Sequence, residues 1–124
     1  MWSSRDNTGE HLWWIPNGNT TERVKKNPAL EGLEIPETGA MAHATKLLTK
    51  TLLMYGAGRG GDALFHAADQ ETGKRIGTVK LPAETNQAPM TYLHEGKQYI
   101  ALPVGQRGFP GSLVALALPN EGGK

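Results

Sequence analysis

A short turn motif occurs twice in this 124-residue chain, and it constrains the fold more than any other feature. One copy, "DNTGEHLWWIP", begins at Asp6, and the other, "DQETGKRIGTVKLP", begins at Asp69. In each copy an aspartate precedes Thr-Gly, and a short run ending in proline follows. The Thr-Gly pairs Thr8-Gly9 and Thr72-Gly73 are aligned at a fixed offset, which indicates a repeat architecture.

The chemistry of this motif predicts a tight turn between two strands. Glycine adopts a positive φ without steric cost, and aspartate and threonine side chains bond nearby backbone amides. With 16 glycines and 8 prolines, the chain should contain many turns and few long helices.

The composition excludes several classes of protein. The length suits one domain, although 38% hydrophobic and 6% aromatic residues make a thin core. A net charge of +1 argues against electrostatic binding of nucleic acid. The absence of cysteine excludes disulfides and thiolate metal sites. No apolar run approaches the roughly 18 residues of a membrane span, and we expect no export signal in the chain as written.

Short alternating runs bounded by turn residues predict eight strands. Residues 16–44 are read as a long loop, with a helical turn at 21–26 that Thr20 or Thr21 caps and Pro28 closes. A hairpin turn is expected at Glu95-Gly96, and 105–111, "GQRGFPG", is read as a glycine-rich loop. The strands are expected at 10–15 (one), within 45–80 (four) and within 88–118 (three).

Four antiparallel strands make one propeller blade, so the repeat favours an all-β β-propeller fold with about two four-stranded blades. Residues 45–80 are interpreted as a complete blade and 88–118 as three strands of a second. The strand at 10–15 is interpreted as an outer strand, because it follows the same turn as residues 74–80. The whole chain, 1–124, is thus predicted to be a two-blade propeller fragment.

The motif resembles the blade signature of the pyrroloquinoline-quinone (PQQ) dependent dehydrogenases, Ala-x-Asp-x-x-Thr-Gly-x-x-x-Trp. Trp13 stands at the tryptophan position of the first copy, and Gly77 stands there in the second. "APMTYLHEGKQYIALPVG" and "GSLVALALP" look like the C-terminal end of a dehydrogenase of the membrane glucose-dehydrogenase type. "NPALEGLEIPETG" resembles the loop that enters the preceding blade. The alternative is an unrelated β-repeat protein with Thr-Gly turns.

This resemblance implies a quinoprotein that oxidises an alcohol or sugar, with PQQ and Ca²⁺ on the propeller axis and a periplasmic location. It also implies that the tryptophan stacks on a neighbouring blade and uses its N–H there. The family's base and most metal ligands lie in earlier blades, so no catalytic or metal-binding residue is assigned. We expect the chain to be inactive alone.

Propeller topology predicts that loops between blades and between second and third strands share the ligand-bearing face. Arginines and amides there suit the quinone's carboxylates, whereas the alternative is that they are ordinary solvent-facing turn residues. The four scattered histidines do not predict a metal cluster. The candidate cofactor-binding residues are Thr38, His43, Arg59, Asn86, Gln87, Gln106 and Arg107.

Two blades cannot close a ring, because known propellers have at least four. We therefore expect either a homo-oligomer or association with the remaining blades of a propeller. The strand at 10–15 would complete the sheet made by 88–118, in cis or from a neighbouring copy. Two alternatives stay open: a non-catalytic module that binds a partner or small ligand on the loop face, and a fragment without separate activity.

Overall fold

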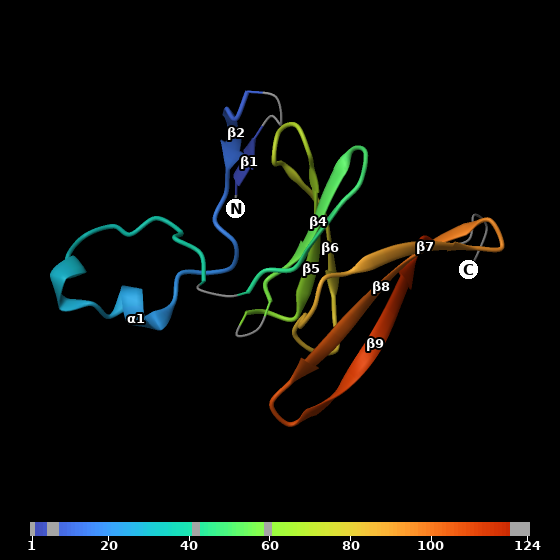
Figure 1. Ribbon diagram of the computed structural model, residues 1–124. Coiled ribbons are helices and arrows are strands. Elements are labelled where there is room, and N and C mark those ends of the chain that lie inside the picture. Colours follow the sequence, from blue (N-terminus) through green and yellow to red (C-terminus); the bar gives the residue numbers. More distant parts are fainter. Residues whose placement is uncertain (1, 5–7, 41–42, 59–60, 120–124) are drawn as a thin grey trace.

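The computed structural model describes residues 2–4, 8–40, 43–58 and 61–119, and nearly all of its regular structure is antiparallel β (Figure 1). The fold class predicted from the sequence is confirmed. Three sheets follow one another along the chain: β1 (Trp2–Ser4) with β2 (His11–Trp14); β3 (Lys46–Leu48), β4 (Leu52–Gly56), β5 (Leu64–Asp69) and β6 (Arg75–Lys80); and β7 (Met90–His94), β8 (Lys97–Gln106) and β9 (Phe109–Ala117).

The turn between β5 and β6 is stabilised as the sequence predicted. Asp69 Oδ1 accepts from Glu71 N at 3.1 Å and from both Thr72 N and Thr72 Oγ1 at 2.8 Å. These bonds lower the pKa of the Asp69 carboxyl, chiefly through the Thr72 side chain. Gly73 has a φ of +71°, a conformation that glycine adopts without strain.

Trp13 joins the first sheet to the second, as the resemblance implied. Its Nε1 donates to the Gln70 carbonyl at 2.9 Å, and its ring lies against Gly73, where an added Cβ would come within 2.5 Å of Cδ2. Adjacent Trp14 is 66% exposed, because neighbouring strand residues point to opposite faces.

The core consists of two apolar clusters on opposite faces of the sheet β3–β6. Leu53, Tyr55 and Ala68 pack under Trp13 and Ile15. On the other face, Phe65 packs with residues of the third sheet and of the loop after β6. The buried members of this second cluster are Phe65, Leu81, Ala83, Leu102 and Val104.

The part of the predicted loop at 16–40 projects to one side of the sheets in Figure 1 and carries only short helices. Helix α1 (Glu22–Lys25) lies within the predicted helical turn, and Thr21 is its N-cap residue, but no side chain bonds the cap. The helix ends before Pro28, as predicted, with Lys26 as its C-cap residue, and Pro28 then begins a 3₁₀ helix, η1 (Pro28–Leu30). Proline suits a first helical position because it needs no N–H donor there.

Two strand predictions need correction. Residues 105–111 are not a loop, since β8 runs to Gln106 and β9 starts at Phe109. Gly108, with a φ of +83°, closes a two-residue turn, and Pro110 is tolerated because β9 is an edge strand of its sheet. Strand β1 was not predicted. Among the described residues, no helix has the length and apolarity needed to cross a membrane.

The buried side chain of His66 on β5 should make the free energy of unfolding depend on pH. The side chain is 6% exposed, and its Nδ1 lies 2.8 Å from Thr78 Oγ1. Burial, and then the positive charge of Arg75, lower the pKa of His66 from 6.5, against a smaller opposing effect of Asp62.

Between the lowered folded pKa and 6.5 the unfolded chain binds more protons, so the free energy of unfolding should fall as pH falls below about 6.5. Urea unfolding at several pH values between 5 and 7.5 measures this slope. In a His66→Gln variant the slope should weaken, and an unchanged slope would contradict the assignment to His66.

Candidate functional site

The loop between β6 and β7 forms a seam that holds the second and third sheets together. Gly105 N donates to the Glu84 carbonyl at 2.9 Å, and Asn86 N donates to the Pro103 carbonyl at 3.1 Å. A further backbone bond joins Leu81 N to the Ala63 carbonyl at 2.9 Å. The first two bonds fix the loop against β8 and the third fixes it against the second sheet, just before β5, so nearby side chains are positioned by paired backbone.

Thr85 is the central residue of this seam and is 1% exposed. Its Oγ1 accepts from Gly58 N at 3.1 Å, which ties the loop after β4 to the loop after β6. Gly58 has a φ of +81°, and a Cβ added there would overlap the His43 carbonyl. Three loops from different parts of the chain therefore meet at Gly58.

Replacing Thr85 tests this convergence. Thr85→Val keeps the shape of the side chain but leaves the Gly58 amide without its acceptor, so we expect a loss of about 1–3 kcal/mol in the free energy of unfolding. Thr91→Val is the matched control, because the Thr91 hydroxyl bonds the Tyr99 carbonyl on an exposed strand, where water can replace it. Equal losses in urea unfolding would contradict a special role for Thr85.

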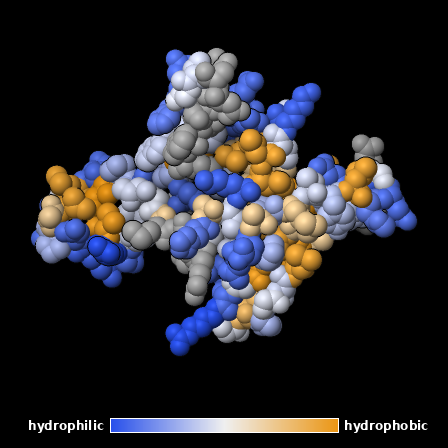
Figure 2. Space-filling view, viewed as in Figure 1, coloured by the Kyte–Doolittle hydropathy of each residue, from blue (hydrophilic) through white to orange (hydrophobic). Residues whose placement is uncertain are grey.

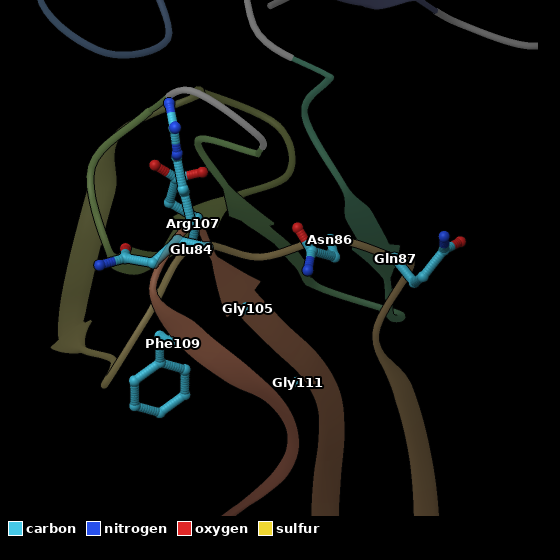
Figure 3. A pocket seen from close by; sticks show the side chains of 8 residues that line it. Glu84, Asn86, Gln87, Gly105, Arg107, Phe109 and Gly111 are labelled. Carbon is cyan, nitrogen blue, oxygen red and sulfur yellow. The ribbon is translucent and has the colours of Figure 1, made fainter.

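Beside this seam lies a hollow of about 700 Å³ between the β6–β7 loop and the β8–β9 turn (Figure 3). Figure 3 shows Arg107 and Glu84 at one end and Asn86 with Gln87 at the other. The lining combines one guanidinium, three carboxamides, a carboxylate and an aromatic ring: Arg107, Asn86, Gln87, Gln106, Glu84 and Phe109, with Gly105 and Gly111.

The structure brings together four of the seven predicted site residues: Asn86, Gln87, Gln106 and Arg107. Thr38 lies elsewhere, because its N and Oγ1 contact Thr20 Oγ1 at 2.9 and 3.4 Å within the segment 16–44. His43 is exposed and meets Gly58 through its backbone. Arg59 lies outside the described residues. Cofactor binding by these residues stays a prediction.

Sequence reasoning missed Glu84 and Phe109 as lining residues. Phe109 belongs to the run "GQRGFPG" that was assigned to the site face, but only its arginine and carboxamide were selected as groups that bind carboxylates. Glu84 has no sequence signal of this kind. Its place follows from the seam bond that its carbonyl accepts.

The donor set of the hollow fits the carboxylates of a quinone such as PQQ better than it fits a cation. Arginine and amide N–H groups recognise carboxylates, whereas the negative charge of Glu84 disfavours them. The described residues contain no group of three or more acidic or histidine side chains able to hold a metal ion. Near the segment 43–58, two buried acceptors, Asn17 Oδ1 and Thr45 Oγ1, have no hydrogen-bond partner.

The four-stranded antiparallel sheet and the repeated Thr-Gly turn are consistent with the blades of a β-propeller. A family model for the PQQ-type β-propeller domain of glucose, ethanol and alcohol dehydrogenases matches residues 4–100. The chain therefore belongs to this family of PQQ-dependent dehydrogenase propeller domains.

Individual relatives match about half of the chain. Methanol dehydrogenase [cytochrome c] subunit 1 of Paracoccus denitrificans is 42% identical over 63 residues, which cover 49% of this chain and 10% of that protein. Quinoprotein glucose dehydrogenase A of Acinetobacter calcoaceticus is 37% identical over 65 residues, which cover 48% of this chain and 8% of that protein. The matched segments thus span about a tenth of these relatives. No solved structure gives a significant match.

Proposed function

We propose that this chain supplies part of the cofactor-binding face of a PQQ-dependent dehydrogenase that oxidises an alcohol or a sugar, and that it is inactive alone. The observation that carries the proposal is the hollow at the loop face, which is lined by Arg107 and three carboxamides. The relatives are named as methanol and quinoprotein glucose dehydrogenases, which supports this substrate class.

In this proposal Arg107 and the amides of Asn86, Gln87 and Gln106 hold carboxylate groups of the quinone and fix its orientation. The bound quinone would accept the electrons of the alcohol, while the protein supplies position and electrostatics. The predicted cofactor-binding set also includes Thr38, His43 and Arg59. The proposal further includes Ca²⁺, held by residues of other blades. The resemblance supports a periplasmic location for the assembled enzyme.

Titration of PQQ into the 124-residue chain, with and without Ca²⁺, tests this function. We expect saturable changes in quinone absorbance and at least a tenfold weaker affinity in Arg107→Gln. Arg23→Gln is the matched control, because Arg23 lies on α1, away from the sheets (Figure 1). Equal affinities in the two variants, or no binding by the folded chain, would contradict the proposal.

A second candidate is a non-catalytic module that self-assembles into a ring. It is favoured by the third sheet, which has three strands and leaves β9 at an edge among the described residues. An unpaired edge recruits a further strand, and in this candidate a strand of another copy adds to β9. The strand expected to do this, at 10–15, pairs with β1 in this structure, so β2 would have to exchange partners to reach β9. The remaining blades of a longer propeller are the alternative partner.

Light scattering over a range of concentrations tests self-assembly. Leu113 is 71% exposed on β9, so Leu113→Lys should reduce the mass of any oligomer. Leu33→Lys, at a 64% exposed leucine of the segment 16–44, should leave the mass unchanged. A monomeric wild-type chain at every concentration would contradict self-assembly and would favour a larger propeller.

A further inference from the structure

An apolar groove of about 340 Å³ lies between the second and third sheets. One wall includes Met54, Ala67 and Gly77, which are cross-strand neighbours on β4, β5 and β6. The opposite wall includes Ile100 and Leu116, which are paired on β8 and β9. In Figure 2 hydrophobic residues gather over the part of the molecule that these sheets form. The groove is separate from the hollow at the loop face, because the two share no lining residue.

The groove lies where the internal repeat would place a tryptophan. In the first sheet, Ser3 of β1 pairs with Trp13 of β2, and the register shifts at the next residue of β1. In the second sheet, Ala67 of β5 pairs with Gly77 of β6, and the register shifts at the next residue of β5. Each pair is separated from the other by the sixty-four residues that separate the two Thr-Gly turns. Gly77 is therefore the structural counterpart of Trp13.

The two counterparts have opposite surroundings. The indole of Trp13 fills the space between the first and second sheets and contacts Gly73. At Gly77 an added Cβ would meet no atom within 4 Å, so the corresponding space between the second and third sheets stays open. The open space has apolar walls and belongs to a position that, one repeat earlier, contains an indole ring.

We propose that this groove binds a small planar aromatic molecule of the size of indole. Its volume lies at the lower end of the range of small-molecule sites, roughly 300–1,000 Å³. Apolar cavities smaller than this one bind benzene when a large side chain has been removed from them. Here the sequence itself has glycine at the position of the large side chain. This site is independent of the quinone function.

Methyl NMR of the 124-residue chain labelled at the methionine methyl groups tests the proposal, with indole as the probe. Met54 lines the groove, whereas Met90 is 58% exposed on β7 and is absent from the lining. We expect a saturable upfield shift of the Met54 signal, from the ring current of the indole, with little change at Met90. No shift at Met54, or equal and non-saturating shifts at both methionines, would overturn the proposal.

Two variants localise the site. Gly77→Trp places an indole in the groove, and the Met54 response to added indole should fall at least tenfold. Lys80→Trp adds the same side chain to an exposed position of β6 that is absent from the lining, so the response should be retained. An unchanged response in folded Gly77→Trp would overturn the proposal. If that variant does not fold, the comparison of Met54 with Met90 in the wild-type chain decides.

Discussion

Trp13→Ala should lower the free energy of unfolding by about 3 kcal/mol, in the range found when large aromatic side chains are truncated. The expected loss has two sources. The indole packs on the backbone at Gly73 and over the cluster of Leu53, Tyr55 and Ala68. Its N–H also satisfies the Gln70 carbonyl at 2.9 Å, which would lose its protein donor.

Trp14→Ala is the matched control for this prediction. It removes the same side chain from the adjacent residue, which is 66% exposed, so the expected change is within about 0.5 kcal/mol. Trp13→Phe separates the two sources, because it keeps an aromatic ring and removes the N–H. Urea unfolding followed by circular dichroism measures all three variants. Similar losses for Trp13→Ala and Trp14→Ala would show that the interface between these sheets is not a stabilising contact.

The position of Trp13 was predictable because it depends on local sequence. The Thr-Gly turn fixes where the strand starts, and alternation along the strand fixes which residues face the neighbouring sheet. The strands of the second sheet were predictable for the same reason, since turn residues bound each of them.

The errors arose where tertiary contacts override local signals. Glycine and proline in 105–111 indicated a loop, but pairing with β8 extends β9 to Phe109, and proline is compatible with an edge. Strand β1 is three residues long and forms only by pairing with β2. A run of three residues is too short for alternation of apolar and polar side chains to identify it as a strand.

The candidate site was predictable to the extent that topology determines it. Asn86, Gln87, Gln106 and Arg107 come together because connections at the same end of neighbouring sheets must be close. Thr38 belongs to a long segment whose internal bonds, such as Thr20 N to Glu37 Oε2 at 2.9 Å, have no sequence signature. The seam around Thr85 was missed for a similar reason, because a threonine in a polar loop gives no indication of burial.

Gly58→Ala should be as damaging as the loss of Trp13, with a decrease of about 3 kcal/mol in the free energy of unfolding. A φ of +81° costs an alanine roughly 1–2 kcal/mol. The added Cβ would also overlap the His43 carbonyl, which is backbone and has little freedom to move aside, and overpacking of this kind costs roughly 1–3 kcal/mol.

Gly96→Ala separates these two costs. Gly96 has a φ of +75°, close to that of Gly58, but nothing lies within 4 Å of the position of its Cβ. It should therefore show the conformational cost alone, and the difference between the variants in urea unfolding reports the contact with His43. If both variants lose the same stability, the close approach of the loops at Gly58 is not required for folding. If Gly58→Ala loses more, PQQ affinity should weaken as well, because Thr85 links Gly58 to the loop that carries Asn86 and Gln87.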